Sequence, residues 1–568
     1  MFPDLQRVRA AAMDWSWAQF RPYFDDLLRR PLSADSVDAW MADWSAVAAL
    51  AAESFSRRSV AHTQDTNDTE AERRYSDFVA ELRPQLAVAQ QKLTERLLAS
   101  GLEPADFTIP LRNLRTDAEL FREANLPLET EESLLRSRYN KTVAAQTVEW
   151  AGEELTLKQL DGALTSARRS ERKQAWLAKS TRVLADREEF NEMWGDLLAN
   201  RRQQATNAGF TDYRAYRWHK MKRFDYTPAD CDTFHAAIEA VVVPVATRIY
   251  TQAAKTLGVD RLRPWDVVND IYLLTQPALR PFDDVNALEN AAAEVFYRVD
   301  ERLGDYYATM QQEHLLDLPN RKGKAPGGYC TRFPAARRPF IFMNAVGNGD
   351  DVRTLLHEAG HAFHVFEASN LPLIQQQRTT SEFSEVASMA MELLAAPYLT
   401  RDAGGFMSSA DARRWRRRHL QKIILFWPYM AVVDAFQHWV YTDPDAAADP
   451  LACDAAWSAL WQRFLPAVDW AGFEAVRDTG WQRKRHIFRV PFYYVEYGLA
   501  QLGAIQVWGN ARRDEKEAIG RYLDALALGG TRAIPALYAA AGARFGFDAP
   551  LLARALALLE SALAELAD

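Results

Sequence analysis

A His-Glu-x-x-His pattern constrains this chain more than any other feature of its sequence. It occupies residues 357–361 within the helical pattern DVRTLLHEAGHAFHVFEA, where His357 and His361 lie about one turn apart on the same face. Both imidazoles can therefore reach one metal ion, and neutral imidazole nitrogens suit Zn²⁺. Glu358, next to the first histidine, can accept a proton from a water molecule made acidic by the metal. The pattern predicts a catalytic zinc site built on one helix.

A catalytic zinc site with two histidines needs a third protein ligand. His364 follows His357 by seven residues, about 10 Å along the helix axis, so we expect it to pack or to support a ligand instead. The segment TTSEFSEVASMAMELL places Glu382, Glu385 and Glu392 on one face of a second helix. The spacing alone leaves both Glu382 and Glu385 as candidates for the third ligand.

Most of the remaining sequence predicts helices. Apolar residues recur at spacings of three and four in the first 110 residues, and helical patterns continue over residues 131–222 and in a closing helix at 549–567. A helix is predicted from Pro228 to Gly258, with a kink or break at Pro244. The glycine-rich region 321–349 differs, because its β-prone runs YCTRF and PFIFMN predict a small antiparallel sheet just before the helix at 351–368.

The composition indicates in which compartment the protein works and which partners are disfavoured. The net charge of -8 argues against nucleic acid as a partner, and three widely spaced cysteines without a CxxC pair are typical of a reducing compartment. No secretory signal and no run of about 18 uncharged apolar residues are apparent, so we expect a cytoplasmic protein that does not span a membrane. Histidines outside the motif show no ligand spacing and are interpreted as structural; they include His219, His235, His314, His419 and His438.

Several separate motifs occur in the order found in one known family. These are GFTDYRAYR, WDVVND, KGKAPGGYCTRF, PFIFMN, the His-Glu-x-x-His helix, SEFSEVASMAMELL, FRVPFYYVEYGLAQ and ALALGG. Over residues 180–545 the chain resembles the oligoendopeptidase F branch of the thimet-oligopeptidase-like metallopeptidases. The resemblance implies that Glu385, in the family's E-x-x-S-x-x-x-E string, is the third zinc ligand, with Ser388 and Glu392 in supporting roles. This donor set is that of a gluzincin.

The resemblance also implies further catalytic residues late in the chain. In the family, a histidine and tyrosines stabilise the tetrahedral intermediate, and the matching residues here are His486, Tyr494 and Tyr497. Tyr493 is an alternative to either tyrosine, and the whole aromatic stripe could instead be core. The glycine-rich loop and its strand are implied to lie along the substrate cleft, where glycines let a backbone approach a peptide closely. A plain flexible hairpin is the alternative.

The fold implied is mainly α-helical and two-lobed, a clam-shell with a deep channel and a small sheet beside the metal-binding helix. We expect a helical region over residues 1–180 and a catalytic region over 181–568. The implied function is a one-zinc oligoendopeptidase, cleaving internal bonds of oligopeptides and excluding folded proteins. A zinc carboxypeptidase or dipeptidyl carboxypeptidase is the nearer alternative, and a non-catalytic peptide-binding protein is the more distant one.

Overall fold

The computed structural model describes residues 2, 5, 7–267 and 279–566. The chain forms two compact units, each built from three separate segments. The first unit comprises Met1–Glu119, Leu279–Trp415 and Ala500–Phe545, and the second comprises Leu120–Ala278, Arg416–Leu499 and Gly546–Asp568. The sequence predicted a different division of the chain, into regions of residues 1–180 and 181–568, and that division stays a prediction.

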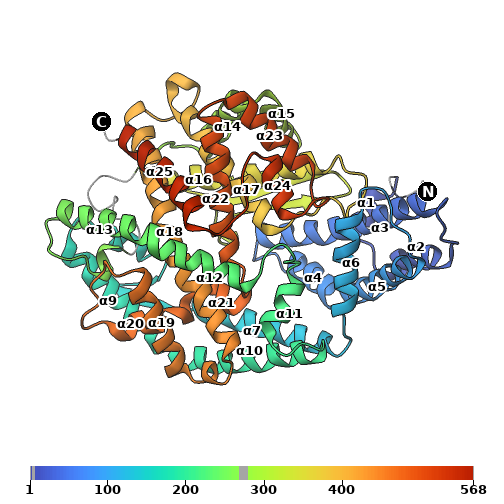
Figure 1. Ribbon diagram of the computed structural model, residues 1–568, viewed down its shortest axis with the longest axis horizontal. Helices are drawn as coiled ribbons and strands as arrows, with labels where there is room; N and C mark the ends of the chain where they lie inside the picture. The colour runs from blue at the N-terminus through green and yellow to red at the C-terminus, as the bar shows by residue number, and fades with distance from the viewer. Residues whose placement is uncertain (1, 3–4, 6, 268–278, 567–568) are drawn as a thin grey trace. The chain divides into compact units, whose positions relative to one another are not determined.

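Helices make up most of the first unit, as its sequence predicts (Figure 1). They are α1 (Arg9–Ala12), α2 (Trp17–Arg29), α3 (Val37–Gln64), α4 (Thr69–Asp77), α5 (Arg83–Ser100), α6 (Thr108–Leu120), α14 (Val285–Val299), α15 (Glu301–Gln312), α16 (Gly349–Ala368), α17 (Ser381–Ala395), α23 (Glu515–Ala527) and α24 (Ile534–Ala540). The apolar faces of α2, α3 and α5 meet in a core that includes Phe24, Trp40, Trp44 and Leu93. The indole N–H of Trp40 donates to the carbonyl of Leu27 at 2.9 Å, so this buried polar group is satisfied.

A three-stranded sheet of the first unit lies directly before α16 in sequence. Strands β4 (Tyr329–Phe333) and β5 (Arg338–Ala345) pair antiparallel, which confirms the predicted hairpin. A third strand, β3 (Leu316–Pro319), pairs parallel with β5, so the sheet is mixed and the expectation of a purely antiparallel sheet is wrong. Four residues of LDLP carry too short a pattern for a strand to be recognised.

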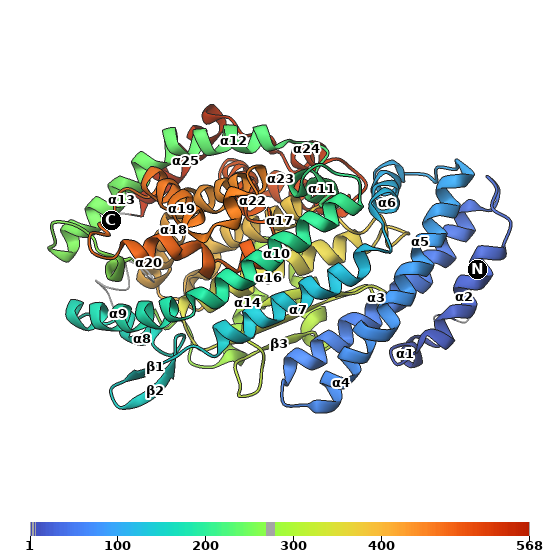
Figure 2. The same ribbon diagram turned by 90° about the horizontal axis from the view of Figure 1, so that it is seen from below.

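The second unit is also helical. Its helices are α7 (Asn125–Ala144), α8 (Asp161–Leu164), α9 (Arg169–Ala185), α10 (Arg187–Asn207), α11 (Tyr213–Lys220), α12 (Pro228–Ala237), α13 (Val243–Leu257), α19 (Pro450–Phe464), α20 (Glu474–Asp478), α21 (Arg485–Arg489) and α25 (Ala549–Glu565). Figure 2 shows α7 and α10 running alongside each other. Two further helices, α18 (Ser409–Thr442) and α22 (Tyr494–Ala511), contribute residues to both units.

Two local features of the second unit bear on the sequence predictions. Near Pro244 the structure shows no full break: α12 continues through a π-helical segment at Ile238–Val242 into α13, so only the α-helical hydrogen-bond pattern is interrupted before the proline. The helical patterns predicted over residues 131–222 are interrupted by a hairpin of β1 (Thr147–Trp150) and β2 (Glu153–Thr156). Its turn places Ala151 and Gly152 at positive φ, as two-residue hairpin turns require.

Helix α18 is long and apolar enough to cross a membrane by length and composition alone. However, 72% of its most apolar window is buried inside the protein, as in a core helix. The length and composition of α18 are therefore only weak evidence that it spans a membrane.

Candidate metal centre

The start of α16 is fixed by a dense set of capping hydrogen bonds. Asn348 accepts from the backbone N–H groups of Asp350 and Asp351. In return, the carboxylate of Asp351 accepts from the N–H groups of Val346, Gly347 and Asn348 at 2.8, 2.8 and 2.9 Å. These bonds satisfy donors at the helix N-terminus and join α16 rigidly to the end of β5.

Helices α16 and α17 pack unusually closely at Gly360, inside the His-Glu-x-x-His motif. A Cβ atom at this position would lie 2.6 Å from the carbonyl oxygen of Ala387 and 2.6 Å from Cα of Ser388. Only glycine fits such a contact without moving a backbone. The close approach brings Glu385 of α17 to the two histidines of α16.

Three predicted ligands meet at this helix pair. One donor atom each of His357, His361 and Glu385 lies within 4.8 Å of the other two. Oε2 of Glu385 is 3.3 Å from Nε2 of His357 and 3.6 Å from Nε2 of His361. Two imidazole nitrogens and one carboxylate oxygen form a donor set that fits zinc. Glu382 and His364 are buried and lie outside this group.

The Nδ1 atoms of both imidazoles and the carboxylate of Glu385 also have partners. Nδ1 of His357 lies 2.7 Å from Oε1 of Glu392, and Nδ1 of His361 lies 3.4 Å from Oγ of Ser384. Ser388 donates to Oε2 of Glu385 at 3.1 Å. A carboxylate only accepts, so Glu392 keeps the proton of His357 on Nδ1 and leaves the Nε2 lone pair directed at the centre.

Burial and charge set the protonation of this centre. Burial, together with Glu385 and Glu392, raises the pKa of Glu358 to about 7, although His357 and the Cys330 N–H lower it. Burial lowers the pKa of His361 to about 4, so that imidazole is neutral at pH 7. Burial also disfavours the charged form of His357, but the bonds to Glu385 and Glu392 outweigh it and raise the pKa to about 10. A bound cation would replace that proton on Nε2.

The glycine-rich loop before β4 is tied down at several points. The buried ammonium group of Lys324 donates to the carbonyls of Asp317, Pro319 and Met343 and to the carboxylate of Asp317. Asn344 donates to the carbonyls of residues 325 and 327 at 2.8 and 2.9 Å. These bonds argue against a flexible hairpin, because each would break if the loop moved.

The predicted histidine and tyrosines form one cluster in the second unit. The ring centroid of His486, on α21, lies 4.8 Å from that of Tyr494 and 5.9 Å from that of Tyr497. The Tyr493 ring is 6.4 Å from it. Tyr494 is buried, whereas Tyr493 and Tyr497 are half-buried. Burial, helped by the charges of Lys484 and nearby arginines, lowers the pKa of His486 to about 3, so its imidazole is neutral at pH 7.

A buried arginine holds the short helix that carries His486. Arg201 of α10 donates to the carbonyl of Ile487 at 3.2 Å and to that of Phe488. Its charge is balanced by Glu132 of α7, whose Oε1 accepts from Nε at 3.0 Å. The ion pair therefore fixes the backbone immediately after His486.

The chain is similar to known peptidases. The sequence pattern of peptidase family M3 matches residues 163–556. An oligoendopeptidase F homolog of Borreliella burgdorferi is 22% identical over 51% of this chain, and the oligopeptidase PepF of Bacillus subtilis is 24% identical over 40%. The matches cover 48% and 34% of those two proteins, so the chain spans half or less of the length of these curated relatives.

Similarity to a solved structure extends over almost the whole chain. The structure of Pz peptidase A with an inhibitor has a TM-score of 0.88 and 28% sequence identity, covering 97% of this chain and 98% of that one. The fold is therefore the mainly helical one expected from the motifs. Because the family pattern covers well over half of the sequence and includes the His-Glu-x-x-His helix, the chain belongs to peptidase family M3.

Proposed function

We propose that the chain is a zinc-dependent oligoendopeptidase that binds one catalytic ion and cleaves internal bonds of short, unfolded peptides. The observation that carries this proposal is the convergence of His357, His361 and Glu385 beside the carboxylate of Glu358. Family membership supports peptides as the substrates. A cytoplasmic location and the exclusion of folded proteins by a channel stay predictions.

The protein groups around the centre match the proton transfers of peptide hydrolysis. Bound zinc supplies a Lewis acid that polarises the scissile carbonyl and makes water more acidic. Glu358 accepts a proton from the attacking water and returns it to the leaving nitrogen as the C–N bond breaks. Burial of Glu358 favours its protonated form, which helps this carboxylate to accept the proton. His486, Tyr494 and Tyr497 are the predicted donors to the carbonyl oxygen.

Strand β4 offers a way to hold an extended peptide next to Glu358. Among the described residues β4 pairs with β5 alone, so one edge has no strand partner there. The Cys330 N–H of this strand reaches the Glu358 carboxylate. Addition of a peptide to such an edge aligns its backbone by main-chain hydrogen bonds, and the loop held by Lys324 would be a rigid border for it.

The test is hydrolysis of an internally quenched peptide of about ten residues that is blocked at both ends. The peptide is long enough to lie extended along a strand edge, and the blocked ends exclude cleavage that depends on a free terminus. Purified protein is assayed alone, with a chelator, and after zinc is restored, with casein in parallel. Chelator-sensitive, zinc-restored cleavage of the peptide with casein spared supports the proposal. Cleavage only of peptides with a free C-terminus would indicate a carboxypeptidase, and no cleavage by a zinc-loaded sample would indicate a binding protein.

A further inference from the structure

Four buried metal-ligand side chains lie on two helices of the second unit. Cys231 and His235 are four residues apart on α12, and Asp434 and His438 are four residues apart on α18. Their exposed fractions are 0%, 3%, 0% and 5%. A spacing of four places each pair on one helix face, the same spacing that joins His357 and His361. The sequence interpretation of His235 and His438 as structural compared histidines only with one another and did not consider Cys231 and Asp434.

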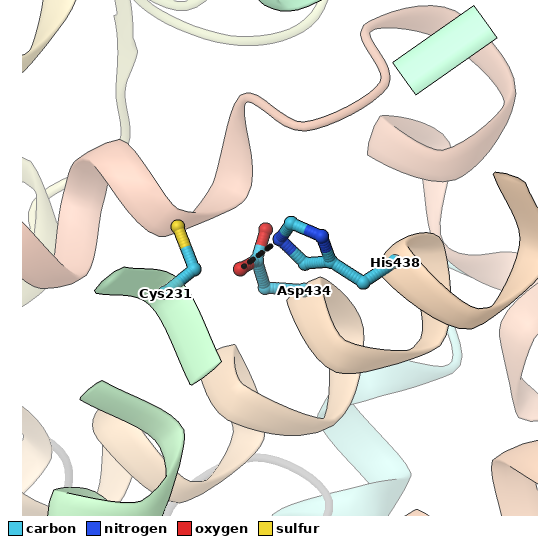
Figure 3. A group of neighbouring side chains, drawn as sticks. All are labelled: Cys231, Asp434 and His438. Atoms are coloured by element: carbon cyan, nitrogen blue, oxygen red, sulfur yellow. Dashed lines mark ion pairs between the residues drawn. The ribbon is translucent and has the colours of Figure 1, made fainter. Parts of the chain in front are cut away.

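The helices bring these donors together. One ligand atom each of Cys231, Asp434 and His438 lies within 4.8 Å of the other two. Figure 3 shows the carboxylate of Asp434 between the sulfur of Cys231 and the imidazole of His438. Nε2 of His235 and of His438 lie 3.0 and 3.4 Å from Oδ2 of Asp434. Ligands of a tetrahedral zinc ion are roughly 3.3–3.8 Å apart. His235 lies outside the group of three mutually close donors, so its ring must move towards them to become the fourth ligand.

Two atoms of the cluster lack a hydrogen bond of good geometry. Oδ1 of Asp434 is buried without a hydrogen-bond partner, and Nε2 of His438 has only the 3.4 Å approach to Oδ2 of Asp434. Leaving such groups unsatisfied is costly, and a bound ion is one arrangement that satisfies them. A divalent cation would satisfy both atoms, and with one carboxylate and one thiolate the buried site would be electrically neutral.

We propose that Cys231, Asp434, His438 and His235 bind a second divalent ion of the zinc class. Thiolate and imidazole ligands select zinc over magnesium and calcium. Because all four side chains are buried, the ion would join α12 to α18 as a structural centre and leave no position for a substrate. Binding through Nε2 of His438 places a proton on Nδ1, so the Arg214 guanidinium, now 3.5 Å from Nδ1, must turn away. The second ion is independent of the proposed peptidase activity.

Cobalt distinguishes the two centres, because only the second one has a sulfur ligand. Metal-free protein is loaded with Co²⁺, the bound metal is counted, and the near-ultraviolet spectrum is recorded. The expected result is two ions per chain and a thiolate-to-cobalt charge-transfer band. The band should disappear in Cys231→Ser and persist in Cys330→Ser and Cys453→Ser, which alter the other two cysteines. It should also persist in His361→Ala, which damages only the first centre.

A single bound ion without a sulfur band would overturn the proposal, and so would a band that survives Cys231→Ser. The number of ions and the sulfur band of the wild-type protein test the proposal even if a variant fails to fold. As a second check, His438→Gln should weaken binding at the sulfur centre by at least tenfold, which titration of the charge-transfer band measures. Unchanged affinity in that variant would remove His438 from the ligand set.

Discussion

Oε1 of Glu392 lies 2.7 Å from Nδ1 of His357, so the helix that carries the proposed ligand Glu385 also carries a carboxylate that holds one of the histidines. Glu385 and Glu392 are seven residues apart on α17, about two turns, and both face α16. The outer carboxylate fixes the tautomer and ring orientation of His357, and it makes the imidazole a better donor.

Replacing Glu392 by Ala should therefore weaken zinc binding about 10–100-fold. Glu392→Gln should cost less, because the amide oxygen can still accept from Nδ1. Zinc affinity is measured by competition with a chromogenic chelator. Glu382→Gln is the matched control, since Glu382 is a buried carboxylate of the same helix outside the ligand group. Affinity in Glu392→Ala equal to that of the wild type would contradict the orienting role.

Glu358→Gln should retain one equivalent of zinc at His357, His361 and Glu385 while kcat falls by about two to four orders of magnitude. The amide has nearly the same shape as the carboxylate but cannot accept the proton of the attacking water. Steady-state hydrolysis of the quenched peptide and zinc analysis of the same sample provide the two readouts. Full activity would exclude Glu358 as the base.

Gly360→Ala should separate the two helices that form the metal centre. The added methyl group would lie 2.6 Å from backbone atoms of α17, so we expect a loss of about 1–3 kcal/mol and weaker zinc binding. Gly520→Ala on α23 is the matched control, because nothing lies within 4 Å of its Cβ and alanine favours the helix by about 0.5–1 kcal/mol. Thermal unfolding and zinc affinity of both variants are compared. Equal effects would show that close packing at Gly360 is unimportant.

The tyrosine hydroxyls should differ in their effect on turnover. Tyr497 is half-buried, whereas Tyr494 is only 6% exposed and its ring lies under the ammonium group of Lys484 at 3.7 Å. If Tyr497 donates to the carbonyl oxygen, Tyr497→Phe should lower kcat about 10²–10³-fold with little change in KM. Tyr494→Phe should have the smaller effect. The reverse order would identify Tyr494 as the donor.

The ion pair between Glu132 and Arg201 should make stability depend on acidity. Burial alone would raise the pKa of Glu132, but Arg201 and Arg136 outweigh it and lower the pKa from 4.5 to about 2. A lowered folded pKa stabilises the native state above pH 4.5, and this contribution decreases as the pH falls towards 2. From the shift, the pair contributes about 3 kcal/mol at pH 7 and about 2 kcal/mol less at pH 3.

Urea unfolding of the wild type and Glu132→Gln at pH 7 and pH 3 measures this dependence. The variant should be less stable at pH 7, and the difference should shrink at pH 3. At pH 3 the carboxylate is protonated in the unfolded chain but still mostly ionised in the folded protein, so proton uptake favours unfolding of the wild type. A difference that stays constant between the two pH values would show that Glu132 titrates normally. Arg21→Gln, which removes an exposed ion pair with Asp25, is the control and should change stability by less than about 1 kcal/mol.

The local sequence was sufficient to predict features that depend only on residues close together in the chain. The spacing of His357 and His361 determines that both rings share a face, whatever surrounds the helix. Pro244 and Gly258 determine where the α-helical hydrogen-bond pattern is interrupted and where the helix ends, because their backbone restrictions act on the residues themselves. The runs YCTRF and PFIFMN predicted a hairpin for the same reason: their β-prone residues are joined by a short connection.

Contacts between distant segments required the tertiary structure. Spacing could not separate Glu382 from Glu385; family resemblance favoured Glu385, and close packing at Gly360 places its carboxylate against both histidines. Strand β3 is too short to recognise without its partner β5. Cys231 and Asp434 are far apart in sequence, and each i, i+4 pair looks like an ordinary helix face until α12 and α18 are packed together. Helical periodicity specifies a face, but only packing decides what that face meets.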